Sequence, residues 1–538
     1  MNVRAIAVLS ATIFAAAIIS ARGRRSARAE QDNAVPPSQQ PLRVTTRLVQ
    51  FDVIVLDKHG SPVTGLTKDD FAVFDNKSQR TIQLFSVETG QMLPGATEPL
   101  PSNTYSNEIQ AAGVPSNLTV ILLDSFNTGF FDQSFARSQI VKLLRTIQTN
   151  DRVAPYALGA RLRVLHEFSS DAASLAEALK NYLGEHALDM DSARSESIST
   201  LHKDLEALAA AEGIDDSHPF TQDHRHPTAE ALRMIADHVG SLPGRKNLLW
   251  VSGNFPFSVE TSNLQRTADG QRIPFATDVE LTMRALNNAN VAVYPVDARG
   301  LVDSGLIGAS ASSNIEQDMA KFSAMESLAR RTGGFAFYNT NGIKGSIRQA
   351  IDESRVTYQL GFYPEDANWD GSFHKLHVKV NRPDTHVQTR EGYFALPEPN
   401  IAGQTWAEML SEIATSPVEA TGIRIRAQVT PPYKPGEKTL SLVLSLDTAQ
   451  FRFAQGGGAW NDVVSVAYIQ LDEKNRVIET RRLRLPLAID SETYAQLMKQ
   501  GMILTRDVQV LPDAAGVQII VRDGASGKIG SVRIPIAR

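Results

Sequence analysis

One short segment of the chain limits the possible folds more than any other. Residues 118–123 read LTVILL, an almost wholly apolar run that ends at Asp124. A run of this kind is typical of a strand that is covered on both faces, as in a parallel sheet flanked by helices. The segment that follows has apolar residues at helical spacing, at Ala136, Ile140, Leu143, Leu144 and Ile147. A buried strand followed by an amphipathic helix predicts the start of an α/β unit.

The same alternation continues along the chain. Further strands are predicted at residues 152–158, 161–168, 247–251, 291–296 and 334–338. Helices are predicted at residues 172–182, 229–239, 278–288, 318–331 and 344–354. The close spacing of the second and third strands indicates a hairpin, and therefore one antiparallel edge strand. We expect an α/β open sheet, mostly parallel, over residues 117–357.

An insertion interrupts this alternation at residues 187–226. It contains a cluster of metal-type side chains, at Asp215, Asp216, His218, Asp223, His224 and His226. Two histidines separated by one residue suit zinc or copper. The other interpretation is a solvated surface loop, because no helical or strand spacing fixes these side chains relative to one another.

Two short β-rich segments flank the α/β region, at residues 43–90 and 358–396. A small isolated sheet is marginally stable until another layer covers its apolar face. We therefore expect the two segments to pack together as one discontinuous β-domain, with the α/β region inserted into it. The expected core brings Phe51, Val53, Phe71 and Val73 against Leu376, Val378 and Val380.

The carboxy-terminal region, residues 400–538, has a different character. Seven apolar runs at turn-rich spacing predict a β-sandwich there. Residues 91–116 show no periodicity and are expected to be a linker between the first β segment and the α/β region.

Composition excludes several classes of protein. The 538 residues include 54 Lys and Arg against 59 Asp and Glu, a net charge of −5 that gives no field for binding nucleic acid. The absence of cysteine removes disulfides, zinc–thiolate sites and iron–sulfur clusters. The chain contains no GxSxG, Walker, GxGxxG or HExxH motif, and no nucleophile with its base can be named. A non-enzymatic protein is therefore expected.

The amino terminus resembles an export signal. Residues 5–20 are uncharged and apolar, the length of a signal-peptide core and shorter than the roughly 20 residues of a spanning helix. Ala27 and Ala29 offer a cleavage site before Glu30, although several arginines after the apolar run oppose translocation. We expect a signal peptide at residues 1–29 and a linker at 30–42, with an uncleaved anchor as the alternative. The mature chain would then be secreted, periplasmic or on the cell surface, without a membrane span.

The loop after the first buried strand reads Asp124-Ser125-Phe126-Asn127-Thr128, at the edge where a parallel sheet presents binding residues. It resembles the von Willebrand factor type A (VWA) domain, in which an Asp-x-Ser-x-Ser loop, a Thr and an Asp hold magnesium. The resemblance places Thr228 at the second-loop Thr and Ser252 at the third-loop Asp. Phe126 and Ser252 depart from the family pattern.

The layout of the whole chain is similar to that of exported VWA-related bacterial proteins frequent in acidobacteria. The stretches that carry this resemblance are residues 51–55 to 74–75, 123–128, 291–300, 358–363 and 390–394. That family implies a fold and an export route, and no particular activity.

The resemblance implies two sets of site residues. Asp124, Thr128, Thr228 and Ser252 would form a degenerate metal-ion-dependent adhesion site that binds Mg²⁺ weakly, because a single carboxylate is a poor hold on that ion. Alternatively, Asp124 and Thr128 satisfy loop amides, and Thr228 caps the helix that follows it. Asp124, Asn127, Asp297 and Arg299 would contact a partner, although Asp297 and Arg299 also suit a local ion pair.

Two functions follow from these residues. The first is an exported, non-enzymatic binding or adhesion protein whose VWA-like domain binds a protein or glycan. The alternative is a metal-assisted hydrolase that uses the His- and Asp-rich insertion.

Overall fold

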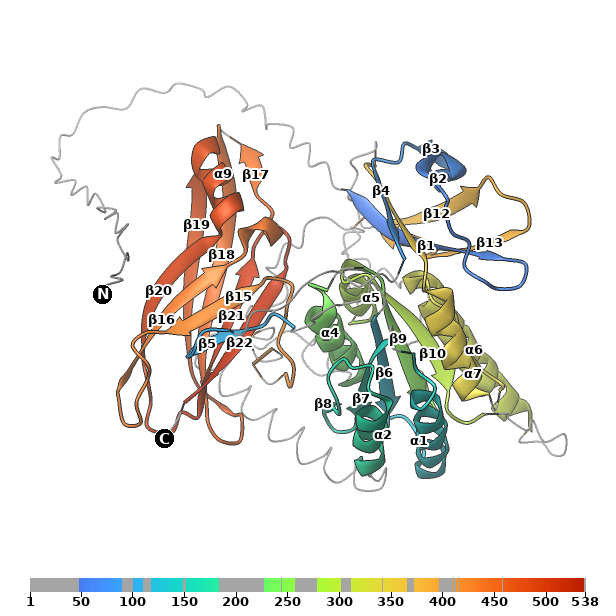
Figure 1. Cartoon of the computed structure of the whole chain (residues 1–538), viewed down its shortest axis with the longest axis horizontal. Helices are drawn as coiled ribbons and strands as arrows, with labels where there is room; N and C mark the ends of the chain where they lie inside the picture. The colour runs from blue at the N-terminus through green and yellow to red at the C-terminus, as the bar shows by residue number, and fades with distance from the viewer. Residues whose placement is uncertain are drawn as a thin grey trace, which may run out of the picture. The chain divides into compact units, whose positions relative to one another are not determined.

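The computed structural model contains α/β and all-β regions (Figure 1). It describes residues 48–89, 100–109, 118–148, 151–182, 227–242, 244–256, 278–300, 311–340, 342–364, 372–395, 410, 413–414, 416–456 and 458–536. The expected signal peptide, the linker at 30–42 and the insertion at 187–226 lie outside these residues, and so do the histidines and aspartates of the hydrolase alternative. No helix in the described ranges is long and apolar enough to cross a membrane.

The α/β region is built on a mixed sheet with the strand order β10-β9-β6-β7-β8. Its strands are β6 (Leu118–Asp124), β7 (Arg152–Leu158), β8 (Leu162–Val164), β9 (Lys246–Ser252) and β10 (Val291–Asp297). Strands β10, β9, β6 and β7 are parallel to one another, and the edge strand β8 pairs antiparallel with β7. The strand predicted at residues 334–338 is reduced to one parallel bridge, between Val296 and Phe337.

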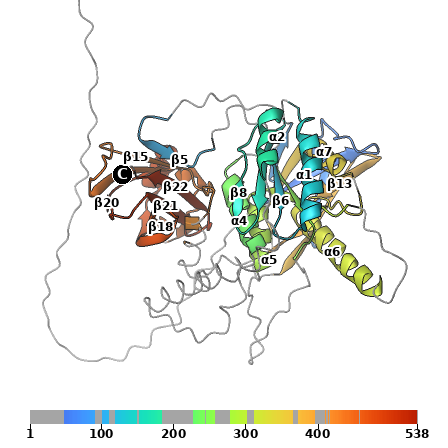
Figure 2. The same cartoon turned by 90° about the horizontal axis from the view of Figure 1, so that it is seen from below.

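Helices cover both faces of this sheet, which is why β6 is buried along its whole length (Figure 2). One face packs against α1 (Phe130–Leu144), α2 (Ala172–Asn181) and α7 (Ile343–Glu353). The other packs against α4 (Pro227–Val239), α5 (Asp278–Asn288) and α6 (Ala311–Thr332). Alternate β6 side chains enter the two cores, with Val120 and Leu122 on one face and Ile121 and Leu123 on the other.

The two short β segments pair with each other across about 300 residues of chain. One sheet has the order β13-β1-β11-β4 and the other β14-β12-β2-β3. The bounds are β1 (Val49–Asp57), β2 (Phe71–Asp75), β3 (Ser78–Arg80), β4 (Leu84–Glu88), β11 (Thr357–Phe362), β12 (Phe373–Val380), β13 (Thr385–Thr389) and β14 (Gly392–Phe394), with a 3-10 turn at Lys68–Asp70. Val73 lies opposite Val378 and Phe71 opposite Val380, and Phe51 and Val53 join the same core. The predicted packing of these segments is confirmed.

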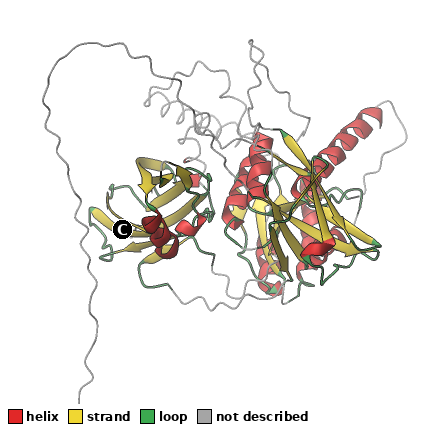
Figure 3. Ribbon diagram, turned by 90° about the horizontal axis from the view of Figure 1, so that it is seen from above, coloured by secondary structure: helices red, strands yellow, loops and turns green. Residues whose placement is uncertain are grey.

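The carboxy-terminal region forms two sheets around one apolar core (Figure 3). The first has the order β20-β16-β15-β5, and in the second β18 pairs with β17, β19 and β21, which pairs with β22. The bounds are β15 (Ile425–Val429), β16 (Thr439–Leu446), β17 (Ala454–Gly456), β18 (Ala459–Leu471), β19 (Val477–Ile489), β20 (Met502–Gln509), β21 (Gly516–Asp523) and β22 (Ile529–Pro535), with a 3-10 turn at Thr448–Gln450 and helix α9 at Ser491–Gln500.

One strand of this sandwich comes from a segment that the sequence predicts to be a linker. Residues Thr104–Ser106 form β5, which pairs antiparallel with β15 so that Tyr105 lies opposite Ala427. The prediction of a plain linker at 91–116 is therefore corrected. A three-residue strand is too short to show a periodicity, and its partner lies more than 300 residues away.

Candidate functional site

The carboxyl edge of the mixed sheet is organised around Asp124, the last residue of β6. Its side chain is 0% exposed and accepts hydrogen bonds through both oxygens. Oδ1 accepts from the Asn127 backbone N–H at 3.0 Å. Oδ2 accepts from Asn127 Nδ2 and Trp250 Nε1, each at 2.9 Å, and the Ser252 hydroxyl lies 2.9 Å from the same oxygen. Burial raises the pKa of Asp124, and these hydrogen bonds oppose the rise.

The other predicted site residues meet at the same place. Asn127 Nδ2 also donates to Thr228 Oγ1, at 2.9 Å, from the loop after β6 to the first turn of α4. Thr128 Oγ1 accepts from the Gly253 N–H at 2.8 Å, which ties the loop to the end of β9. Gln133 of α1 also fixes the conformation of this loop, because its Nε2 donates to the Ser125 and Thr128 carbonyls at 3.0 and 2.7 Å.

These contacts bring Asp124, Thr128, Thr228 and Ser252 together but do not fit a divalent cation. Magnesium requires near-octahedral oxygen ligands, usually including one or two carboxylates with free lone pairs. The one carboxylate here already accepts three N–H bonds, and the Thr228 hydroxyl accepts a fourth from the Asn127 amide. Among the residues that the structure describes, no group of three or more His, Asp or Glu side chains could hold a metal.

The expected partner-binding residues Asp124 and Asn127 differ in how far they are exposed to solvent. Asp124 lies beneath the surface, so it shapes the loops rather than facing solvent. Asn127 is half-buried above it, and its side chain is committed to Asp124 and Thr228.

No family model and no curated protein matches the sequence. Similar solved structures include the vWF domain of the type V pili tip protein Mfa5 from Porphyromonas gingivalis, at 11% identity over 44% of this chain and 94% of that one, with a TM-score of 0.25. A von Willebrand factor type A protein from Catenulispora acidiphila has 10% identity over 78% of this chain and 77% of that one, with a TM-score of 0.26. The chain is similar to VWA-domain proteins.

A third similar structure is proximal thread matrix protein 1 from the mussel byssus, at 8% identity over 45% of this chain, with a TM-score of 0.25. The chain spans about half of that protein's length, 48%. Identities and TM-scores this low transfer no residue's role, so the chemistry of the site rests on its own side chains. We call residues 118–354 the VWA-like domain.

The second loop cluster on this edge of the VWA-like domain centres on Arg299. Its Nη2 lies 2.8 Å from Asp297 Oδ2 at the end of β10, and its Nη1 lies 2.6 Å from Asp318 Oδ1 of α6. Asp132 of α1 is close enough that the charge of Asp297 adds to burial in raising its pKa. Arg299 is tied into a local ion pair, yet 21% of its side chain stays exposed.

Two exposed apolar side chains adjoin members of this cluster in the sequence. Phe131 precedes Asp132 on α1 and is 87% exposed, and Met319 follows Asp318 on α6 and is 65% exposed. Sequence reasoning missed both. Helical periodicity alone indicates which side of a helix is apolar, and neither residue lies on such a face.

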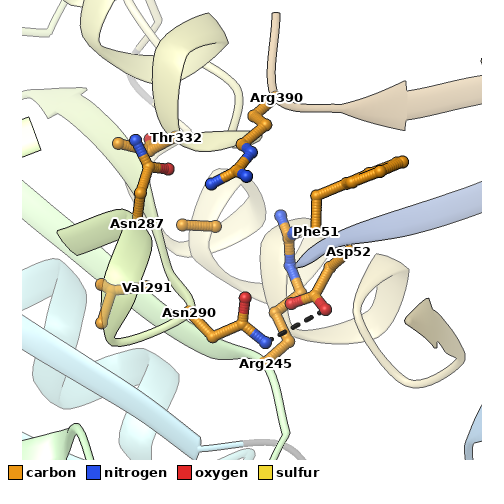
Figure 4. A pocket seen from close by; sticks show the side chains of 9 residues that line it. Phe51, Asp52, Arg245, Asn287, Asn290, Val291, Thr332 and Arg390 are labelled. Carbon is orange, nitrogen blue, oxygen red and sulfur yellow. Dashed lines mark hydrogen bonds between the residues drawn. The ribbon is translucent and has the colours of Figure 1, made fainter. Parts of the chain in front are cut away.

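A separate cavity lies at the opposite, amino edge of the sheet, where the discontinuous β-domain meets the VWA-like domain (Figure 4). Asp52 accepts from Asn290 Nδ2 at 3.1 Å, and Arg245 and Arg390 also line the cavity. It encloses about 10 Å³, room for one water molecule rather than a metabolite.

Burial shifts the pKa values of several charged groups around this junction. Burial raises the pKa of Asp52 and lowers that of Arg390 to about 10. Burial and the Asp52 charge raise the pKa of Glu88 to about 7, and burial lowers the pKa of Lys246 to about 8. The junction gathers buried charged side chains, and sequence reasoning missed it because Asp52 occupies a polar position of an alternating strand.

Proposed function

We propose that the chain is an exported binding or adhesion protein that catalyses no reaction and binds a protein or glycan at the carboxyl edge of its VWA-like domain. The observation that carries this proposal is the convergence of three loops on that edge. They present a partly exposed Arg299 held by Asp297 and Asp318, and the exposed Phe131 and Met319 adjoin Asp132 and Asp318 in the sequence. Arginine, aromatic and methionine side chains are enriched at protein-binding surfaces.

The metal-type residues act in this proposal as a degenerate adhesion site. Asp124, Thr128, Thr228 and Ser252 hold the loops in place, and Asn127, Asp297 and Arg299 form the layer above them. Export rests on the apolar residues 5–20. Mass spectrometry of the natural protein should place its amino terminus near Glu30.

The binding surface is tested with the chain from Glu30 onward on a glycan array and on a display library of extracellular and cell-surface protein fragments. Arg299→Ala should reduce binding to any ligand recovered by tenfold or more. Arg355→Ala is the matched control, because Arg355 also bridges two carboxylates, Asp151 and Asp352, at the amino edge. Equal loss in both variants, or no loss in Arg299→Ala, would contradict the proposal.

A further inference from the structure

We infer that the side-chain amide of Asn127 takes the place of a divalent cation at the carboxyl edge, so that this site works without a metal. The inference deepens the proposed function, and it rests on that function only for the use of this edge as the binding surface. The evidence is the set of hydrogen bonds around one nitrogen atom.

The Asn127 amide nitrogen bridges the two oxygens that a cation would have to share. It lies 2.9 Å from Asp124 Oδ2 and 2.9 Å from Thr228 Oγ1, on residues 104 positions apart by number. A primary amide has two N–H donors, and here each one has an acceptor. A magnesium ion would need the same lone pairs at about 2.0–2.1 Å.

Two other groups in contact with the Asp124 carboxylate are also N–H donors, which stabilise a carboxylate by hydrogen bonding and leave no place for a metal ion. The Trp250 indole N–H is a donor that can never accept, and it lies 2.9 Å from Oδ2. The Asn127 backbone N–H occupies Oδ1 at 3.0 Å, which also fixes the loop that carries the amide. Donors therefore reach the carboxylate from β9 and from the loop, and together they offset a charge that is fully buried.

The two departures from the family pattern agree with this arrangement. Ser252 provides a hydroxyl where a second carboxylate would stand, so no further negative charge is available for an ion. Phe126 provides an aromatic ring that packs against the apolar core beside α4. The groups that surround Asp124 are neutral donors, and they need no ion.

This arrangement limits how a partner can bind. A carboxylate of the partner cannot complete a coordination sphere on Asp124, because that side chain is 0% exposed and already hydrogen-bonded. Recognition at this edge then depends on the surface side chains, and chelators should leave it unchanged.

The isosteric substitution Asn127→Asp tests the inference. It puts a carboxylate oxygen where the N–H group lies, about 2.9 Å from Asp124 Oδ2, and two carboxylates that close require a proton or a cation between them. Melting temperatures are measured in EDTA, in 10 mM MgCl₂ and in 10 mM MnCl₂, and calorimetry follows titration with MnCl₂. None of these readouts depends on a partner, so failure here and failure of the proposed function are distinguishable.

The wild-type chain should melt at the same temperature in all three buffers and give no binding heat with Mn²⁺. Asn127→Asp should melt lower in EDTA and recover by 5 °C or more in Mn²⁺. Asn127→Ala is the control: it should melt lower in every buffer, without recovery. Submillimolar Mn²⁺ binding by the wild type that Asp124→Ala abolishes would overturn the inference, and so would a folded Asn127→Asp that Mn²⁺ does not stabilise. If Asn127→Asp does not fold, the wild-type titration decides alone.

Discussion

At the scale of single residues, two carboxyl groups lie together inside the carboxy-terminal sandwich. Asp462 of β18 and Asp523 of β21 are both buried. Asp523 Oδ2 accepts from the Arg452 and Ser526 N–H groups, at 3.2 and 2.9 Å. Burial, followed by the hydrogen bond and charge of Asp523, raises the pKa of Asp462 to about 8. The pair therefore carries a proton at neutral pH, in the manner of other close carboxyl pairs.

This proton makes the stability of the sandwich depend on pH. A carboxyl group whose pKa is higher in the folded chain contributes stability that is fully present below about pH 4, its unfolded pKa, and lost as the pH rises through about 8. Of the nearby cations, Arg522 is buried and Lys528 is exposed. The free energy of unfolding should therefore fall between about pH 4 and pH 8.

Asp462→Asn should remove about 1–2 kcal/mol of that fall, a figure reduced for solvent screening, because the amide never ionises. Urea unfolding at several pH values measures the difference. Asp507→Asn on β20, which alters a carboxylate on the exposed side of the sandwich, is the control and should keep the wild-type slope. An unchanged slope in Asp462→Asn would show that the pair does not share a proton.

At the scale of elements, β5 depends on the residue that follows it. Asn107 is buried, and its Nδ2 donates to the Ala420 and Ile423 carbonyls at 2.7 and 2.8 Å. Its Oδ1 accepts from the Ile425 N–H at 2.8 Å. One side chain thus satisfies three backbone groups beside β15 that would otherwise be buried without partners.

Asn107→Ala should cost about 3 kcal/mol, because it leaves buried backbone groups unpaired. Pulse proteolysis in urea, followed at the carboxy-terminal sandwich, measures the shift of the midpoint. The neighbouring Glu108→Ala removes only a partly exposed ion pair with Arg426 and should cost about 0.5 kcal/mol or less. Equal midpoints for the two variants would mean that the Asn107 side chain adds nothing to the stability of the sandwich.

The strand β1 shows how far sequence periodicity reaches at this scale. Its alternation predicts one buried face, and Phe51, Val53 and Val55 do lie in the β-domain core. Asp52 and Ile54 on the other face are buried as well, because the VWA-like domain approaches there. An alternation with a period of two predicts the strand and the face that packs into the β-domain core. Burial of the other face depends on the VWA-like domain, which is built from distant residues.

At the scale of the whole molecule, the β-domain is assembled from both sides of the VWA-like domain. Val53 of β1 lies opposite Tyr358 of β11, and Val73 of β2 lies opposite Val378 of β12. Both sheets therefore combine strands from the two segments. Neither segment can complete its core without the other.

A chain that ends at Ser354 should lose that core. Phe51 and Val53 would keep neither β11 nor β12 as cover, so the truncated chain should bind a hydrophobic dye strongly and be cleaved early within residues 48–89. A chain that ends at residue 398 keeps β11 to β14 and is the control. Comparable dye binding by the two truncations would contradict the interdependence of the segments.

Local pattern determined the elements and much of their assembly. The apolar run 118–123 and the helical spacing after it predicted an α/β sheet, because burial on both faces of a strand and on one side of a helix leaves a periodic trace in nearby residues. Likewise, each flanking β segment is too small to form a stable core alone, and this predicted that the two segments pair with each other. The residue types at the carboxyl edge pointed to Asp124, Thr228 and Ser252 as one site, through a family resemblance.

Tertiary structure alone decided what that site is. Three features depend on contacts between distant segments. The Asn127 amide lies between Asp124 and Thr228, and Thr104–Ser106 completes a sandwich whose other strands lie more than 300 residues away. Asp52 is buried where the β-domain meets the VWA-like domain. Such contacts leave no periodicity, because a hydrogen bond needs only two groups within about 3 Å, and the packing of whole domains determines which groups meet.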